Sequence, residues 1–117
     1  MKQQVGAPRA SQQVSEKRPV RTRYFRDLLV WQKSMQLAHA IYRHTSGFPK
    51  AEVFGLTGQM RRAAVSVPSN IAEGHGRLSD GSMRVFVAQA RGSLFELETQ
   101  IELASGLGYL KSGAEKE

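Results

Sequence analysis

The sequence LTGQMRRAAVSVPSNIAE, residues 56–73, has a strongly helical pattern of apolar residues. Its apolar positions follow steps of four, three, four and four residues: Leu56, Met60, Ala63, Val67 and Ile71. Because an α-helix has 3.6 residues per turn, these steps place the five side chains on one face. Pro68 lacks the backbone N–H that a helix needs, so we expect a kink or a short break near Val67. The stretch predicts an amphipathic helix over residues 53–73, stopped by the Gly-His-Gly sequence at 74–76.

The same helical pattern recurs on both sides of this stretch. Residues 27–45 form the earlier segment, in which Asp27 is placed to cap the N-terminus. The later segment begins at residue 79 or 80 and runs to residue 105, where Gly106 closes it. The earlier stripe is Leu28, Trp31, Met35, Ala38, Ile41 or Tyr42, and Thr45, and the later one is Phe86, Ala90, Leu94, Leu97, Ile101 and Ala104. No segment alternates apolar and polar residues as a half-buried strand does, so the chain is predicted to be all-α.

The 117 residues have room for one domain, which we place at residues 24–110. Residues 1–23 contain six Lys or Arg and one Glu and few large apolar side chains, so we expect a disordered basic extension. This extension carries +5 of the net charge of +7. Such a tail attracts phosphate backbones or anionic surfaces, and the alternatives are a solubilising extension or a start site assigned too early. Residues 111–117 are predicted to form a short polar tail.

Composition and spacing also exclude several classes of function. There is no cysteine, and no run approaches the ~18 apolar residues that a membrane span needs. The N-terminus has no secretory pattern, so we expect a cytoplasmic protein without a membrane partner. His39 and His44 are five residues apart and fall on different helix faces, so they and His75 form no metal set. With catalytic motifs also missing, we expect no metal, no cofactor and no enzymatic activity.

Four segments carry a family resemblance. They are FRDLLVWQK at 25–33, FGLTGQMRRAAVSVPSNIAEG at 54–74, GSLFELE at 92–98 and LGYL at 107–110. Together they resemble the four helix bundle proteins, also called ribosomal RNA intervening-sequence proteins. That family is related to the accessory protein of diversity-generating retroelements. The resemblance spans about residues 25–110 and is closest over 61–74.

The resemblance implies an up-down helical bundle that assembles into a ring-shaped homopentamer without known enzymatic activity. It also implies association with nucleic acid and, in the retroelement relatives, with a reverse transcriptase. The family pattern continues after Gly108-Tyr109-Leu110 with a fourth amphipathic helix. Residues 111–117 contain one Ala and no larger apolar side chain, so we expect that helix to be absent. Three apolar stripes would then have an uncovered side, which should promote association.

Arginines provide the candidate nucleic-acid site. Arg77, Arg84 and Arg91 recur every seven residues, so Arg84 and Arg91 should share one side of the third helix. With Arg61 or Arg62 they would offer fork-shaped donors to phosphates. The alternatives are a solvated face or intersubunit pairing with acids of the third helix, Glu96, Glu98 and Glu102. No base-reading motif is present, so sequence specificity is not expected.

A polar cluster surrounds the proline of the second helix. Its members are Ser66, Pro68, Ser69, Asn70 and Glu73. We expect their side chains to satisfy backbone groups that the proline frees near Ala64, and Glu73 to pair with Arg77 one turn later. A binding site at this cluster is the alternative. Among the aromatic residues, Trp31 and Phe86 fall on apolar stripes and should be buried, whereas Phe95 marks a second apolar face.

These observations lead to one principal hypothesis and two alternatives. The principal hypothesis is a non-enzymatic helical bundle that self-associates and binds RNA or a nucleic-acid-handling partner, such as a reverse transcriptase-like protein. The first alternative is a purely structural or protein-interaction oligomer, which the net charge of only +2 outside residues 1–23 favours. The second is a truncated, inactive family member.

Overall fold

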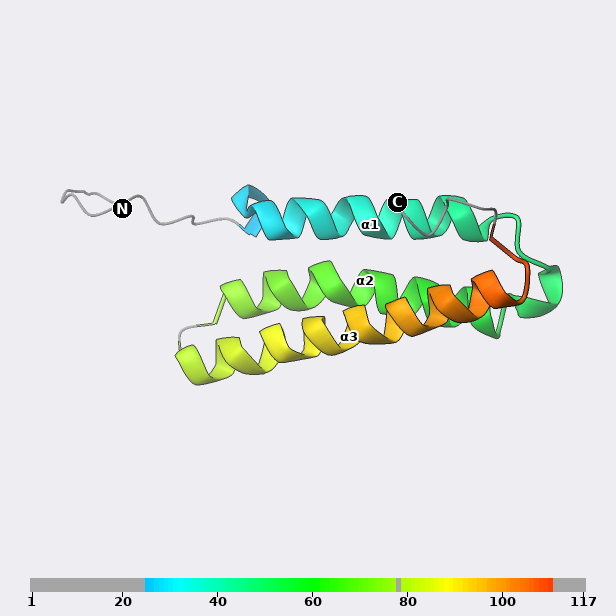
Figure 1. Cartoon of the computed structure of the whole chain (residues 1–117). Helices are drawn as coiled ribbons and strands as arrows, with labels where there is room; N and C mark the ends of the chain where they lie inside the picture. The colour runs from blue at the N-terminus through cyan, green and yellow to red at the C-terminus, as the bar shows by residue number, and fades with distance from the viewer. Residues whose placement is uncertain (1–24, 78, 111–117) are drawn as a thin grey trace.

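The computed structural model describes residues 25–77 and 79–110. Three long helices carry the architecture: α1 (Leu29–Thr45), α2 (Leu56–His75) and α3 (Asp80–Gly106). Two 3-10 turns accompany them, η1 (Phe25–Asp27) before α1 and η2 (Lys50–Glu52) between α1 and α2. Figure 1 shows each long helix running antiparallel to the one before it, so the predicted all-α, up-down bundle is confirmed. The predictions for residues 1–23 and 111–117, including the missing fourth helix, lie outside the described residues.

The start of α1 differs from the prediction. Asp27 does not cap the helix, because it belongs to η1, whose turn is closed by a hydrogen bond of 3.0 Å from the Leu28 N–H to the Phe25 carbonyl. Leu28 takes the cap position and makes no side-chain cap bond. By contrast, Ser79 caps α3, since its hydroxyl accepts the N–H of Ser82 at 3.1 Å. The third helix therefore begins where its spacing predicted.

The second helix continues through Pro68 as one element of 20 residues. The short break that we expected near Val67 is therefore not formed. The helix ends at His75, and the N–H of Gly76 donates to the carbonyls of Ala72 and Glu73 at 3.3 and 3.2 Å. The Gly-His-Gly sequence thus stops the helix as predicted, with its first glycine still inside.

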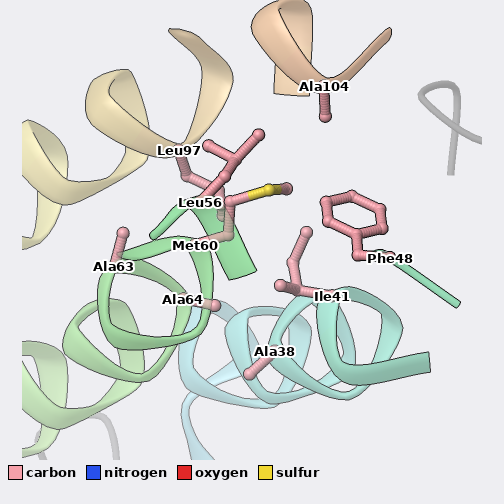
Figure 2. Close-up of a cluster of buried hydrophobic side chains, with 9 residues drawn as sticks. All are labelled: Ala38, Ile41, Phe48, Leu56, Met60, Ala63, Ala64, Leu97 and Ala104. Atoms are coloured by element: carbon pink, nitrogen blue, oxygen red, sulfur yellow. The ribbon is translucent and has the colours of Figure 1, made fainter. Parts of the chain in front are cut away.

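The core forms around α2. Figure 2 shows side chains of α1, α2 and α3 and of Phe48, from the α1–α2 connection, meeting in one apolar cluster. The predicted α2 stripe is confirmed from Leu56 to Val67, whose members Leu56, Met60, Ala63 and Val67 are buried, whereas Ile71 is only half-buried and lines a groove. Of the two candidates in α1, Ile41 is buried and Tyr42 is exposed. The cluster comprises Ala38, Ile41, Phe48, Leu56, Met60, Ala63, Ala64, Leu97 and Ala104.

The three helices do not pack equally. In the described residues α2 packs most extensively against α3 and also against α1, whereas no comparable contact joins α1 to α3. Close approach of α2 and α3 depends on Gly74, which is buried at the end of their hairpin. A Cβ atom added there would lie 3.1 Å from the Cβ of Phe86. The bundle is thus open along the side between α1 and α3.

Candidate interaction surfaces

The arginines of α3 form an exposed pair. Arg84 and Arg91 are both exposed, and their separation of seven residues places them on nearly the same face of the helix. The Arg91 guanidinium carbon lies 5.5 Å from the centre of the Phe95 ring, a cation–π arrangement. This face can therefore offer two planar cationic groups to a ligand with phosphate oxygens.

The two adjacent arginines of α2 lie in different environments. Arg61 reaches α1, where its Nε donates to Thr45 Oγ1 at 2.9 Å and its Nη2 donates to the Tyr42 carbonyl at 3.2 Å. Its guanidinium also stands 4.5 Å from the centre of the Tyr42 ring. Arg62 is exposed. Arg61 therefore fastens α2 to α1, and of the two only Arg62 is fully presented to solvent.

Arg77 follows the end of α2 and bridges to α3. Its Nη2 pairs with Glu73 Oε2 at 2.8 Å, as the sequence predicted. The same guanidinium lies 4.6 Å from the centre of the Phe86 ring. An exposed ion pair of this kind contributes at most about 1 kcal/mol. The predicted arginine set is thus divided among three places, and Arg84 and Arg91 alone share a helix face.

The polar cluster around Pro68 joins two helices. Asn70 Nδ2 donates to the Ser66 carbonyl at 2.8 Å and to the Ser66 hydroxyl at 2.9 Å. The Ser66 hydroxyl in turn lies 2.7 Å from the hydroxyl of Ser93 on α3. The hydrogen bonds therefore go to Ser66 and across to α3, whereas we expected them at Ala64. Pro68 is buried and Ser69 is exposed.

Ser93 is a member of this network that the sequence analysis missed. It lies three residues after Ala90 and four before Leu97, so it falls on the buried stripe of α3. A small polar residue at such a position needs a hydrogen-bond partner from the facing helix. That spacing was the signal that pointed to it.

An apolar groove opens between α1 and α3, with α2 as its floor. This α1–α3 groove has a volume of about 540 Å³. Among the described residues that line it, the ionisable ones are Lys33 on α1, His75 on α2 and Arg91 on α3, and none is an acid. Leu94, predicted to be core, borders the groove at 41% exposure, because α1 does not close over α3. The lining residues are Leu28, Val30, Lys33, Ser34, Leu37, Val67, Ile71, His75, Met83, Val87, Ala90, Arg91 and Leu94.

A second apolar hollow lies between α1 and α2, with a volume of about 420 Å³. Trp31 and Met35 from α1 and Val65 from α2 border it. Trp31 is half-buried and meets the Phe25 ring edge-on, with 5.2 Å between the ring centres. Phe86 on α3 is also half-buried, so the expected burial of these two aromatic residues is only partly met.

The C-terminal half of α3 carries the opposite charge. Glu96, Glu98 and Glu102 are all exposed, and residues 92–110 contain no Lys or Arg. Phe95 and Leu103 are also exposed there, at 56% and 54%. The third helix is therefore basic in its first half, with Arg84 and Arg91, and acidic with exposed apolar side chains in its second half.

Other kinds of site find no support in the part of the chain that the structure describes. Within residues 25–77 and 79–110, no three side chains of His, Asp or Glu are grouped to hold a metal ion. No helix in the same range has the length and apolarity to cross a membrane. The groove and the charged faces of α3 are thus the main candidate surfaces.

These features define a small antiparallel helical bundle with an open apolar groove and charged outer faces. Residues 26–117 match the family described as 23S rRNA-intervening sequence protein, and the chain belongs to that family. This confirms the resemblance carried by the four sequence segments. A comparison with curated proteins gives no match.

Proposed function

We propose that this protein is a non-enzymatic, self-associating helical bundle of the cytoplasm that binds RNA through the arginine face of α3. The single observation that carries the RNA part is the exposure of Arg84 and Arg91 on one helix face. Seven residues span about 10 Å at 1.5 Å per residue, so the two guanidinium groups can contact separate phosphates of one strand. The family description refers to 23S rRNA, which makes RNA the first nucleic acid to test.

Self-association is supported by the apolar surface of the described residues. Phe54 is 94% exposed at the α1–α2 connection, and valine and leucine side chains border the open α1–α3 groove. Large exposed apolar side chains and an open apolar groove are typical of surfaces that associate with other proteins. Covering it with further copies of the chain removes that surface from water, which is favourable in proportion to the apolar area buried.

An electrophoretic mobility titration tests RNA binding. The full chain should retard a single-stranded RNA at low salt and lose affinity as salt rises, because binding releases counterions. Arg84→Ala should weaken binding and reduce the salt dependence by roughly 0.7 in the logarithmic slope for each lost phosphate contact. Lys50→Ala, which removes one exposed positive charge from η2, is the matched control and should bind as the unmodified chain does.

Two results would decide against the proposal. Indifference to RNA at low salt would remove the nucleic-acid part, and an intact Arg84→Ala/Arg91→Ala complex would assign the binding to other residues. If the chain assembles without RNA affinity, the purely structural oligomer is the better description. Light scattering tests assembly separately, since a compact single-chain species at micromolar concentration would exclude self-association.

A further inference from the structure

No residue within 25–77 and 79–110 covers the α1–α3 groove, and its rims carry positive charge. Val87, Leu94 and Met83 line the α3 side, and Val30 and Leu37 line the α1 side. The exposed cations at its borders are Lys33 on one wall and Arg91 on the other. An occupant therefore needs an apolar helical face about as long as this groove, with negative charge along both edges.

The C-terminal half of α3 has that chemistry. At 100° per residue, Phe95, Thr99 and Leu103 fall on one outer face, with Glu102 along one edge and Glu96 along the other. The Thr99 hydroxyl donates to the Phe95 carbonyl at 3.0 Å, so it needs no partner from outside. We call these five residues the acidic face of α3.

We propose that the α1–α3 groove of one copy binds the acidic face of α3 from a second copy. In this arrangement Phe95 and Leu103 enter the apolar groove, and Glu96 and Glu102 approach Lys33 and Arg91. In the assembled form Arg91 is thus used between copies, and Arg84 is the α3 arginine that remains for RNA. The proposal rests on the self-association part of the proposed function and names the two surfaces that join. It also explains why one helix carries opposite charges in its two halves.

Other segments of this chain fit the groove less well. Residues 1–23 carry a net charge of +5, the same sign as the rims of the groove. Residues 111–117 contain no apolar side chain larger than Ala. Among residues 25–110, α3 after Arg91 is the long helical segment that combines exposed apolar side chains with acids and no base. Charge complementarity thus favours the second copy.

The two surfaces can be used at the same time by one copy. The groove takes residues 83–94 of α3 and the acidic face takes residues 95–103. The centres of the two surfaces point about 140° apart around the helix axis, although they adjoin where the Arg91 guanidinium lies over the Phe95 ring. Because the two surfaces point in different directions, one copy uses them toward two different neighbours, and the interface is head-to-tail. Contacts of this type build closed rings or open filaments, according to the rotation between copies.

Complementation between two defective variants tests the proposal. Val87→Asp places a charge in the groove, and Leu103→Asp places one at the acidic face; both side chains are more than half exposed, so the fold should survive. Each variant alone should be a monomer of 13.0 kDa by light scattering. An equimolar mixture should form a dimer of twice that mass, because one groove and one acidic face stay intact. Circular dichroism verifies that both variants are folded.

Val85→Asp is the matched control. Val85 is 54% exposed, Val87 is 52% exposed, and both lie on α3, but only Val87 lines the groove. The Val85 variant should assemble as the unmodified chain does. A charge exchange provides a second route: Lys33→Glu/Arg91→Glu should raise the concentration needed for assembly at least tenfold, and Glu96→Lys/Glu102→Lys in the other copy should restore mixed pairing.

Each outcome separates this inference from the broader proposal. If the unmodified chain assembles and Val87→Asp assembles equally well, the groove is not the interface, although self-association stands. If both variants are monomeric and their mixture does not pair, the head-to-tail arrangement is wrong. A monomeric unmodified chain would overturn the inference together with self-association, while the RNA titration would still decide the nucleic-acid part.

Discussion

The hydroxyl of Tyr109 donates a hydrogen bond of 2.9 Å to Glu52 Oε2 and so joins the segment after α3 to η2, just before α2. The other carboxylate oxygen, Oε1, accepts the backbone N–H of Leu56 at 3.0 Å. Beside them the rings of Tyr109 and Phe48 are 5.2 Å apart between centres. Glu52 thus serves both as a helix cap and as the anchor for the chain that leaves α3.

This contact predicts a loss of stability in acid. The Leu56 N–H, and secondarily the Tyr109 hydroxyl, lower the pKa of Glu52 below its ordinary value of 4.5. A carboxyl group with a lowered folded pKa stabilises the fold above about pH 4.5, and that contribution is lost as the pH falls through the folded value. Glu52→Gln should therefore flatten the dependence of the unfolding free energy on pH in this range. Urea unfolding at several pH values measures it, and an unchanged slope would contradict the role of Glu52.

The same hydrogen bond shifts the pKa of its donor, Tyr109, in the opposite direction. The hydrogen bond to Glu52 raises the pKa of Tyr109 above 10.0, because the neutral hydroxyl is the form that donates. Its contribution is complete below about pH 10 and is lost as the pH rises through the raised value. Tyr109→Phe should remove the loss of stability that accompanies ionisation of this hydroxyl at alkaline pH. Absorbance titration of the tyrosinates would detect the shift, and equal titration of all three tyrosines would argue against it.

Two glycines should respond in opposite directions to the same substitution. Gly74→Ala places a Cβ atom 3.1 Å from the Cβ of Phe86 and 3.4 Å from the Met83 carbonyl, both fixed to the backbone of α3. We therefore expect α3 to shift by a few tenths of an ångström, at a cost of roughly 1–3 kcal/mol. Gly92→Ala meets nothing within 4 Å and should stabilise α3 by about 0.5–1 kcal/mol through its helix preference. Thermal unfolding of the two variants measures whether each substitution raises or lowers the stability. Equal effects would mean that close packing at Gly74 is not limiting.

The free energy of unfolding should be sensitive to substitution of Asn70, which belongs to the hydrogen-bond network between α2 and α3, and insensitive to substitution of Ser69. Asn70→Ala removes two hydrogen bonds to Ser66 and should lower the unfolding free energy by about 1–2 kcal/mol. Ser69 is exposed on the same helix, so Ser69→Ala should change the unfolding free energy by less than about 0.5 kcal/mol. Chemical denaturation compares them directly. Similar losses would indicate a general helix effect rather than the network.

Arg61 and Arg62 are adjacent in sequence but should contribute differently to stability. Arg61→Ala removes two hydrogen bonds and a ring contact between α2 and α1, and should cost about 1 kcal/mol or more. Arg62→Ala removes an exposed charge and should leave stability within about 0.5 kcal/mol. The order would be reversed if Arg62 held the helices together. Thermal denaturation of the two variants, monitored by circular dichroism, decides between them.

Periodicity predicted the helices well because it reports which side of each helix is apolar. The α2 stripe from Leu56 to Val67 is buried as expected, since α2 has a helix on both sides. The N-terminus of α1 was not predicted, because a 3-10 turn at Phe25–Asp27 competes with the aspartate cap. The preference of aspartate for the cap position does not tell whether the 3-10 turn or the capped helix is the more stable.

The interaction surfaces were harder to predict, because they depend on how the helices are arranged. The seven-residue spacing of Arg84 and Arg91 lies within one helix and was sufficient to place both on one face. Arg61 and Arg62 lie in different environments because α1 packs beside only one of them. The spacing of residues within α2 carries no information about the position of α1. For the same reason Leu94 belongs to the stripe of α3 but borders a groove.

The central position of α2 has a consequence for motion. Because α1 contacts the rest of the bundle mainly through α2, it can detach without disturbing the α2–α3 hairpin, whose partners are also close in sequence. Amide hydrogen exchange should then be slowest in α2 and α3 and faster in α1. Detachment of α1 would also dismantle one wall of the groove, so exchange in α1 should slow whenever a second copy is bound.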